Sequence, residues 1–415
     1  MRPRGAWPWA ALVAGCGAAT PDVSTTSVRV QVSVQEAPAP VVLVATPAPS
    51  ARRVVAAARP SQPSPAPVTC GFERDASAPR ASFAEVSLGH GHSCARIGDG
   101  TVRCWGWNLD GETGNGATGS DRGPAAPAQV RDVEGAAQVC AGFSYSCARL
   151  RDGTAECWGN NSNNQIRSSL RASCTAEPVR SPVDHVRALA CGGWHVCALR
   201  DNGSVWCWGE EAPRYAPWQV RLPGRAVEVV AGWHRSCART AAGAVFCWTV
   251  TAREPVAVQG FASPPVQLAV AERFACAALA DGTAACWGDG YHGELGNGAP
   301  RERREAAAVA GLSDVREVSV HEGRACALTA DGAIWCWGQR ARHGRRGRDA
   351  DDEIVGPTRL TAVGPAEHLY VGERHACAHT RVGDLCCWGD NTYGQLGNNR
   401  TGSSGDPDAP SAVVW

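Results

Sequence analysis

Cysteine is the residue type whose spacing points most directly to chemistry in this chain. Of its 20 cysteines, 14 form seven pairs in which nine residues separate the two cysteines and a tryptophan follows the second. The pairs are Cys94 and Cys104, Cys147 and Cys157, Cys197 and Cys207, Cys237 and Cys247, Cys276 and Cys286, Cys326 and Cys336, and Cys377 and Cys387. Such pairs could form disulfides or bind zinc. Structural zinc sites need closely spaced ligand pairs, which this gap does not provide, so the spacing favours disulfides in an exported chain.

Histidine is the second residue type that could do chemistry. Four histidines precede the first cysteine of a pair by two or three residues: His92, His195, His234 and His375. They could be a metal-binding or acid–base set, but each belongs to a different copy of the repeat. We therefore expect them to pack and form hydrogen bonds between repeats, and we predict neither a metal site nor a catalytic residue. The chain contains no lysine and no Gly-x-Ser-x-Gly elbow, which excludes Schiff-base and P-loop lysine chemistry, and no cofactor is predicted.

A tight turn lies between the two cysteines of each pair. Asp99-Gly100 and Asp281-Gly282 are examples, and a glycine always stands four positions before the second cysteine. Short alternating apolar runs flank these turns, as expected for a β-hairpin. In such a hairpin the two cysteines are directly opposite each other, at a separation that a disulfide can span. We predict one cross-strand disulfide in each hairpin.

The repeat spacing predicts how the hairpins are arranged. Successive first cysteines are 53, 50, 40, 39, 50 and 51 residues apart, which leaves room for four short strands in each period. The hairpin supplies two strands, the segment before it a third, and a Pro-x-x-Val segment a fourth. The predicted fold is an all-β, seven-bladed β-propeller of four-stranded blades. A last Pro-x-x-Val copy at Pro410-Ser411-Ala412-Val413 is expected to complete the first blade and so close the ring.

The N-terminal residues predict export. Residues 1–16 resemble a short signal peptide ending in Val13-Ala14-Gly15-Cys16, which is similar to a bacterial lipobox in which Cys16 is acylated. An ordinary cleaved signal or an unremarkable terminus is the alternative. Residues 17–81 are rich in proline and alanine and predict a disordered spacer, and residues 82–415 form the propeller. We expect an exported protein of the cell envelope, either an outer-membrane lipoprotein or extracellular.

The repeats resemble those of the regulator of chromosome condensation family. Family repeats carry Gly-x-x-His before the hairpin and Trp-Gly-x-Asn-x-x-Gly-x-Leu-Gly after it, and the segments beginning at Trp105, Trp287 and Trp388 match the second motif. Repeats three, four and six lose its Gly-x-Leu-Gly half, and Thr249 replaces the glycine in repeat four. The resemblance covers roughly residues 82–415. It implies a seven-bladed propeller, on which exchange factors, inhibitors, lectins and enzymes all occur.

The net charge of the chain and its predicted oxidising compartment indicate its functional class. The family prototype promotes nucleotide exchange on a small GTPase on chromatin, but here the formal net charge is zero, the cysteine pattern suggests oxidation, and no basic tail is present for DNA. We expect a monomeric interaction module that binds an unknown protein or glycan, binds no nucleic acid, and touches a membrane only through a lipid anchor. Secreted bacterial propellers that inhibit β-lactamases are similar. An envelope hydrolase and an exchange factor are the alternatives.

The loops after Cys-Trp-Gly vary most and are expected on the face opposite the Asp-Gly turns. The candidate binding residues in them are Trp107, Asn108, Tyr215, Trp218, Tyr291, His292 and Tyr393. Arg340 and Arg345 belong to a basic run that could bind an acidic partner, although the acids after it favour a solvated loop.

Outside the repeat pattern, and apart from Cys16, the pairing of Cys70, Cys140, Cys174, Cys191 and Cys386 stays open. Among Cys140, Cys174 and Cys191 an extra bridge between repeats or to a loop is possible, and Cys386 could be free.

Overall fold

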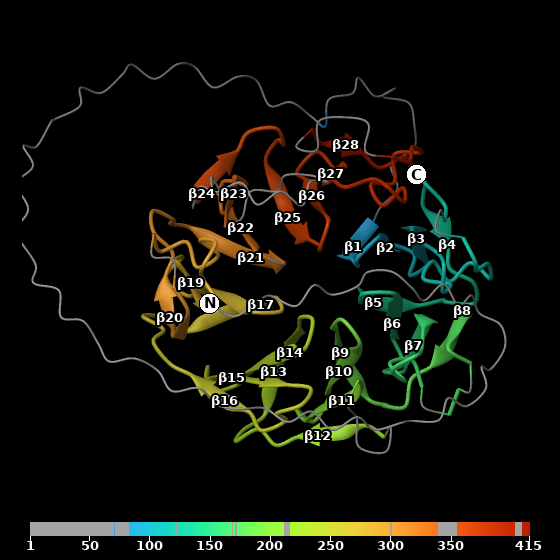
Figure 1. Ribbon diagram of the computed structural model, residues 1–415, viewed down its shortest axis with the longest axis horizontal. Coiled ribbons are helices and arrows are strands. Elements are labelled where there is room, and N and C mark those ends of the chain that lie inside the picture. The colour runs from blue at the N-terminus through green and yellow to red at the C-terminus, as the bar shows by residue number, and fades with distance from the viewer. Residues whose placement is uncertain are drawn as a thin grey trace, which may run out of the picture. The chain divides into compact units, whose positions relative to one another are not determined.

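The chain is a seven-bladed β-propeller in a computed structural model (Figure 1). The structure describes Cys70 and residues 83–415, except 121–122, 168, 171, 211–215, 299–300, 322, 339–354 and 403–408. The predicted signal segment with Cys16, and all of the predicted spacer but Cys70, lie outside these residues. All regular elements in the described part are strands, and none of its segments is a helix of the length and apolarity that a membrane crossing requires.

Each blade is a four-stranded antiparallel meander whose strands follow one another in the chain. Blade 1 holds β1 (Phe83–Leu88), β2 (His92–Ile97), β3 (Val102–Gly106) and β4 (Ala128–Gln129). Blade 2 holds β5 (Ala136–Ala141), β6 (Tyr145–Leu150), β7 (Ala155–Asn160) and β8 (Cys174–Arg180). Blade 3 holds β9 (Val186–Cys191), β10 (His195–Arg200), β11 (Val205–Gly209) and β12 (Trp218–Val220). Blade 4 holds β13 (Ala226–Ala231), β14 (Arg235–Thr240), β15 (Val245–Thr249) and β16 (Val256–Val258).

The remaining three blades repeat this arrangement. Blade 5 holds β17 (Pro265–Val270), β18 (Phe274–Leu279), β19 (Ala284–Gly288) and β20 (Arg303–Ala308). Blade 6 holds β21 (Val315–His321), β22 (Arg324–Thr329), β23 (Ile334–Gly338) and β24 (Val355–Leu360). Blade 7 holds β25 (Ala366–Val371), β26 (His375–Thr380), β27 (Leu385–Gly389) and β28 (Ser411–Ala412). The predicted architecture of seven four-stranded blades is confirmed.

The first strand of every blade lies at the centre of the ring, where it contacts the first strands of the two neighbouring blades. Polar side chains join these inner strands. The amide of Gln138 donates to the carbonyl of Leu189 at 2.9 Å and accepts from its backbone N–H at 2.7 Å, and Gln267 forms the same two bonds with Val318. Because the side chain satisfies backbone groups of the adjacent blade, each such contact fixes one blade against the next.

The predicted hairpin disulfides are all present. Each joins the second and third strands of one blade, where the two cysteines are in direct register, and the seven Cα–Cα distances are 4.0–4.1 Å. The bridges connect Cys94 with Cys104, Cys147 with Cys157, Cys197 with Cys207, Cys237 with Cys247, Cys276 with Cys286, Cys326 with Cys336, and Cys377 with Cys387. Separations this short are typical of pairs that do not exchange backbone hydrogen bonds, in which side chains approach most closely.

The seven bridges differ in how completely they are covered. Cys207 is fully buried, as are most of the hairpin cysteines, whereas Cys247 and Cys336 are only half-buried. In every blade at least one cysteine of the pair is at most 1% exposed. The disulfides therefore lie within the blades and take the place of bulky core residues.

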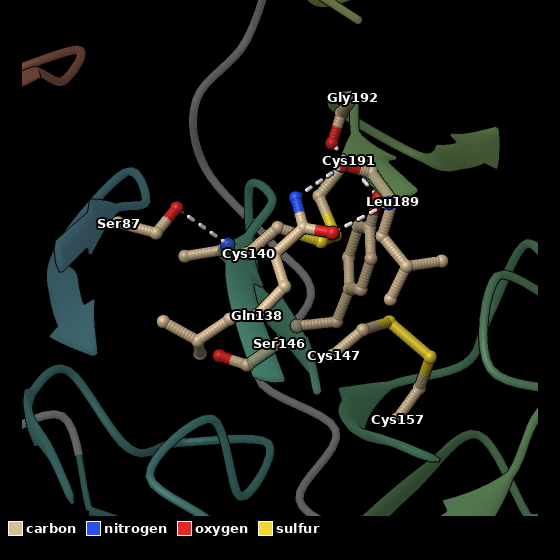
Figure 2. The surroundings of a disulfide bond; sticks show 12 residues. Ser87, Gln138, Cys140, Ser146, Cys147, Cys157, Leu189, Cys191 and Gly192 are labelled. Atoms are coloured by element: carbon tan, nitrogen blue, oxygen red, sulfur yellow. Dashed lines mark hydrogen bonds between the residues drawn. A yellow bond between two sulfur atoms is a disulfide. The ribbon is translucent and has the colours of Figure 1, made fainter. Parts of the chain in front are cut away.

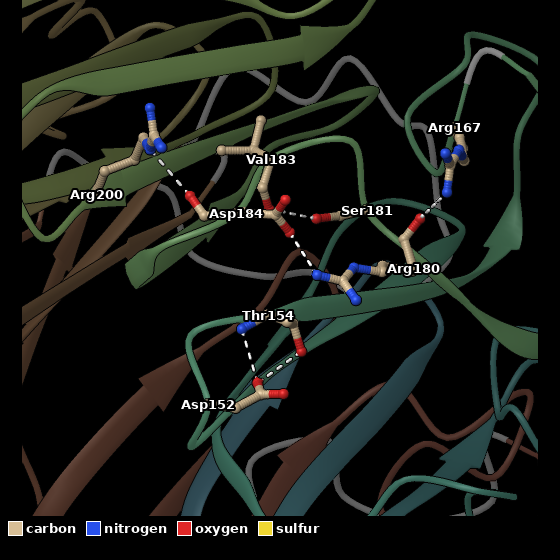
Figure 3. Close-up of polar contacts among 8 residues, drawn as sticks. All are labelled: Asp152, Thr154, Arg167, Arg180, Ser181, Val183, Asp184 and Arg200. Carbon is tan, nitrogen blue, oxygen red and sulfur yellow. Dashed lines mark hydrogen bonds and ion pairs between the residues drawn. The ribbon is translucent and has the colours of Figure 1, made fainter.

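An aspartate side chain shapes the turn at the far end of several hairpins. Figure 3 shows one case, in which the Asp152 carboxylate accepts hydrogen bonds from the backbone N–H of Thr154 at 2.8 Å and from its hydroxyl at 2.7 Å. Asp99 and Thr101, and Asp281 and Thr283, do the same. These hydrogen bonds hold the pKa of each of the three aspartates below its usual value. The glycine between aspartate and threonine supplies the positive φ that the turn requires, as at position 153 (81°).

The predicted ring closure is wrong in its strand assignment. β28 pairs with β27 and is the outer strand of blade 7, whereas the outer strand of blade 1 is β4. Each Pro-x-x-Val segment follows its own hairpin, so no copy is missing at the beginning of the ring. Closure instead comes from contact between β1 and β25 and from side chains beyond β28: Val413 packs in a core cluster with Phe83 and Trp105, and Trp415 stacks on Phe83 at 5.3 Å.

The cysteines outside the repeat pattern are also bonded. Cys140 and Cys191 join the inner strands of blades 2 and 3, close to the Cys147–Cys157 hairpin bridge and to the Gln138–Leu189 hydrogen bonds (Figure 2). Cys386 is not free, because it bonds to Cys70, 316 residues earlier. Cys174 also takes part in a disulfide.

Candidate functional site

Two sets of loops emerge on the same face of the ring. The short connections between the first and second strands begin at Gly89 and its counterparts, and the long loops after Cys-Trp-Gly start beside them. Backbone hydrogen bonds tie the two sets together: Trp107 donates to Gly91, and Asp289 donates to Arg273. We call this the loop face. It lies opposite the Asp-Gly turns, as expected from the strand directions.

The centre of the loop face is a cavity of about 230 Å³ at the mouth of the channel. Its wall is built by the ends of the inner strands and the connections that follow them. Partly buried aromatic side chains from four successive blades gather there: His90, Phe143 and Trp233 line the cavity, and Trp194 packs against Phe143. The ring of Phe143 is 4.3 Å from His90, 4.8 Å from Trp194 and 4.7 Å from Trp233, measured between centroids. These four residues are called the mouth cluster.

Acidic residues line the other side of the same cavity. Glu373 and Glu272 come from blades 7 and 5, and His321 extends from blade 6. Nδ1 of His90 lies 2.5 Å from the Glu373 carboxylate, both side chains being more than four-fifths buried. Burial works to raise the pKa of Glu373, but the hydrogen bond and charge of His90 outweigh it and hold that pKa below its usual value. Burial lowers the pKa of His321 to about 4. The mouth is therefore aromatic on one side and anionic on the other.

All four repeat histidines fulfil the predicted structural role, three of them with a serine as the partner. Nε2 of His92 lies 2.9 Å from the hydroxyl of Ser146 in the next blade, and His195 pairs in the same way with Ser236 at 2.7 Å. His375 of blade 7 reaches Ser93 of blade 1 at 2.7 Å, which joins the two ends of the ring. Desolvation lowers the pKa of these three histidines to about 3, 4 and 3 respectively, so they are neutral at pH 7.

His234 also forms a hydrogen bond between blades, but its partner is a carboxylate: Glu210 follows β11 in blade 3. It stands three residues before its cysteine rather than two, so its side chain leaves the strand at a different place. Its Nδ1 lies 2.8 Å from the Glu210 carboxylate, with 40% of the histidine side chain exposed on the loop face. The hydrogen bond to Glu210 raises the pKa of His234.

The loops after Cys-Trp-Gly stabilise the interfaces between blades. In four blades a backbone carbonyl of the loop accepts the indole N–H of the tryptophan in the following blade, at 2.8–2.9 Å. These donor–acceptor pairs are Trp158–Glu112, Trp208–Gln165, Trp337–Glu294 and Trp105–Gln395. The next loop residue is buried in each case: Thr113, Ile166, Leu295 and Leu396 are at most 6% exposed. We call such a loop a cover loop, because it closes over the neighbouring tryptophan.

The predicted binding residues fall into three groups. Tyr291 and His292 are exposed at the tip of the blade 5 loop, Tyr291 by 59%. Trp107 and Tyr393 are half-buried and contact each other edge to face at 4.2 Å across blades 1 and 7. Asn108 and Trp218 are buried, at 3% and 9% exposure, and support the fold: Asn108 accepts from Thr113 within its loop, and Trp218 packs in the core under the guanidinium of Arg253. Tyr215, Arg340 and Arg345 lie outside the described residues.

The mouth cluster was not among the residues predicted from sequence. Phe143, Trp194 and Trp233 occupy the short connection before the second strand, a segment whose recognisable motif is Gly-x-x-His. The available signal was their place in the repeat: a bulky aromatic next to the glycine of three successive copies must face the ring axis together with its counterparts.

Comparison with known proteins agrees with this geometry. A model described as "Regulator of chromosome condensation (RCC1) repeat" matches residues 83–112, 136–165 and 186–211, which are the first strands, hairpins and loop starts of blades 1 to 3. The chain contains RCC1 repeats. Among solved structures, human WBSCR16 superimposes with a TM-score of 0.65 at 19% identity, covering 76% of this chain and 95% of that one. Prp20p of Saccharomyces cerevisiae gives 0.63 at 17% identity, covering 81% and 88%.

The curated relatives that the chain matches are much longer proteins. The chain is 26% identical over 350 residues to the human E3 ubiquitin-protein ligase HERC2, which covers 76% of this chain and 7% of that protein. It is 32% identical over 158 residues to the human probable E3 ubiquitin-protein ligase HERC6, covering 36% and 15%. The chain therefore spans only a small part of the length of these relatives.

Proposed function

We propose that this RCC1-repeat propeller is a protein-binding module whose partner sits on the loop face, over the mouth cluster. The observation that carries the proposal is the contiguous aromatic surface formed by His90, Phe143, Trp194 and Trp233 at the centre of the ring. Large aromatic side chains that are only half-buried are typical of residues that dominate binding energy in protein interfaces. The work on Prp20p concerns its binding to Gsp1p and histones, so a propeller of this fold has protein partners.

The cysteine chemistry supports a second part of this proposal, that the protein acts after export. Nine disulfides join described residues, and disulfides in this number persist in oxidising compartments. Non-reducing peptide mapping of the protein isolated from its host tests export, because these bridges persist in an oxidising compartment. Recovery of the same cysteines as free thiols would contradict it.

Partner capture tests the binding function. The oxidised full chain is immobilised and exposed to envelope and culture fractions, beside a Phe143→Ala/Trp233→Ala double variant and a control variant, Val382→Asp. Val382 is 46% exposed and lies in the turn of blade 7, on the opposite face. A partner retained by the native chain and by the control, but lost by the double variant, supports the proposal. Retention by all three would place the binding surface elsewhere, and treatment of the captured material with glycosidase or protease tells a glycan from a protein.

A hydrolytic function is the second candidate, favoured by the His90–Glu373 pair that lines the mouth. The Glu373 carboxylate is paired with Nδ1 of His90 and has a lowered pKa, so Glu373 is an anion that can orient the imidazole. Turnover of glycan or peptide substrates by the full chain, abolished in His90→Gln, would establish this function. Turnover that is equal in both proteins would show that the activity has another source.

A further inference from the structure

A groove opens between blades 4 and 5 where a cover loop is absent. Blade 4 passes from the end of β15 at Thr249 to the start of β16 at Val256 through a tight turn in which Thr249 donates its backbone N–H to Ala252. In blade 5 the corresponding segment runs from Gly288 to Arg303 and carries the cover residues Glu294 and Leu295. The short blade 4 segment leaves a cavity of about 640 Å³ on the loop face.

The groove lies against the tryptophan that a cover loop would close. Trp287 of blade 5 lines it, as do Cys247, Trp248, Val256 and Val258 of blade 4. In four other blades the corresponding indole N–H donates to a cover-loop carbonyl. Among the described residues, which include the whole of the blade 4 connection, no acceptor serves the indole N–H of Trp287. Trp287 itself is 3% exposed and packs edge to face against Phe261 at 5.4 Å, so the groove reaches only the rim of this tryptophan. The site resembles the cover-loop position of the other blades at that rim, with the loop removed.

The lining indicates the chemistry of an occupant. Val256 is 68% exposed, which leaves an apolar side chain uncovered at the rim. Four arginines and four carboxylates surround the groove, so its charge is balanced and a strongly charged segment gains nothing from it. The volume is in the range of sites that hold ligands of peptide size. Glu272 lines both this groove and the channel mouth, so an occupant would be continuous with a partner on the mouth cluster.

We propose that the groove binds an extended, uncharged peptide segment of the partner that imitates a cover loop. A leucine or isoleucine side chain of the segment packs on Trp287, as Leu295 packs with Trp337 and Ile166 with Trp208, and the preceding backbone carbonyl accepts the indole hydrogen bond. This inference rests on the proposed protein-binding function and names the partner's chemistry at one place.

The chain supplies a direct probe of this site. A synthetic peptide with the uncharged sequence of residues 391–398, from the cover loop of blade 7, is titrated into the full-length oxidised protein labelled with 15N at the tryptophan indoles. The Trp287 resonance is identified by its loss in Trp287→Phe. We expect this indole signal to move on binding while those of Trp105 and Trp337 stay in place. A peptide with serine in place of the leucine should bind about tenfold more weakly or worse, because it loses the burial of a branched aliphatic side chain.

A surface variant tests whether a loss of peptide binding comes from misfolding. Val256→Asp is expected to weaken peptide binding about tenfold, whereas Val382→Asp on the opposite face should leave it unchanged. Absence of binding at millimolar peptide would overturn the inference, and so would equal affinity for the serine peptide or shifts confined to Trp105 and Trp337. If partner capture succeeds while the peptide fails, the loop-face function stands and only the groove assignment falls.

Discussion

The indole nitrogen of Trp105 in blade 1 donates a hydrogen bond to the backbone carbonyl of Gln395 in blade 7, 2.9 Å away and 290 residues later in the chain. The carbonyl of Gln395 also accepts from the hydroxyl of Ser93. The first and last blades are therefore held together by the same cover-loop contact that joins blades inside the ring. Closure of the propeller uses a repeated interaction and needs no exchanged strand.

Replacing Trp105 with phenylalanine tests this closure. The substitution removes the hydrogen bond to Gln395 and part of a fully buried side chain, so we expect the free energy of unfolding to fall by about 2–3 kcal/mol. Urea denaturation of the oxidised protein measures it. Trp206→Phe is the control, since that half-buried indole bonds only to Ser204 two residues away and its loss should cost less than about 1 kcal/mol. Equal costs for the two variants would show that the contact does not support closure.

Glu112→Gln is expected to stabilise the protein at neutral pH. Burial, with a contribution from the Asp110 carboxylate, raises the pKa of the fully buried Glu112 well above its usual value. As the pH rises above about 4.5, Glu112 ionises in the unfolded chain before it does in the folded chain. It therefore lowers the free energy of unfolding at neutral pH. Glutamine stands at the same place in the cover loops of blades 2 and 7. The side-chain oxygen of Gln165, for example, accepts the backbone N–H of Asn163, as the Glu112 carboxylate accepts that of Asp110.

The gain should be on the order of 1 kcal/mol at pH 7.5 and should vanish near pH 4, as measured by urea denaturation at both pH values. The reciprocal variant, Gln395→Glu, places a carboxyl in a fully buried position and should lose stability with increasing pH. A pH-independent effect in both variants would mean that ionisation of this position does not matter.

Acid should weaken the ring through its buried histidines. The folded pKa values of His92, His195 and His375 are depressed to about 3, 4 and 3, below the value of about 6.5 in the unfolded chain. At a pH between the folded and unfolded pKa values, each of these histidines binds a proton in the unfolded chain but not in the folded protein. Stability contributed by each neutral histidine is complete above about pH 7 and is lost as pH falls, on the order of 2 kcal/mol each by pH 5.

The variant that isolates one of these groups is His195→Gln, which retains a side chain able to bond to Ser236. Its denaturation midpoint should fall less steeply between pH 7 and pH 5 than that of the native protein, by the equivalent of one proton. Identical slopes would assign the acid sensitivity to other residues.

Removal of the Cys140–Cys191 bridge should loosen one blade interface without opening the ring. In the Cys140→Ala/Cys191→Ala variant a crosslink spanning 51 residues is lost, which we expect to lower the unfolding free energy by about 2–4 kcal/mol. The paired hydrogen bonds between Gln138 and Leu189 remain and keep blades 2 and 3 in register. Denaturant unfolding measures the cost, and non-reducing peptide mapping of the native protein should identify both this bridge and Cys70–Cys386. Mapped pairs that join other cysteines would contradict the assignment.

The sequence predicted the blades well because their information is local. The constant spacing from Cys276 to Cys286, the glycine between them and the following tryptophan all act within one hairpin, so a single repeat suffices to interpret them. The position of the last strand was wrong for the opposite reason. A Pro-x-x-Val segment lies between two hairpins and could pair with either, and only the observed register between Ser411 and Cys387 decides which.

The candidate site depended on geometry that local patterns do not contain. Phe143, Trp194 and Trp233 are about 50 and 40 residues apart and meet only because the ring curves. The cover-loop contacts were hidden for a similar reason: loss of Gly-x-Leu-Gly in repeat four was visible in the sequence, but its effect falls on Trp287 of the next blade. Asn108 and Trp218 show the converse error, since polar and aromatic residues in a variable loop resembled a binding surface and are buried.

The placement of the disulfides has a consequence for how the oxidised chain is made. Each hairpin bridge joins cysteines that are ten residues apart, so during synthesis or translocation the correct partner arrives soon after the first thiol and can reach it across a single turn. These bridges can then form in order from the N-terminal end, one per blade, with little need for reshuffling. Cys70 must stay reduced until Cys386 arrives, 316 residues later, which makes its closure a late covalent event and a chemical record that the chain has been completed into the seventh blade.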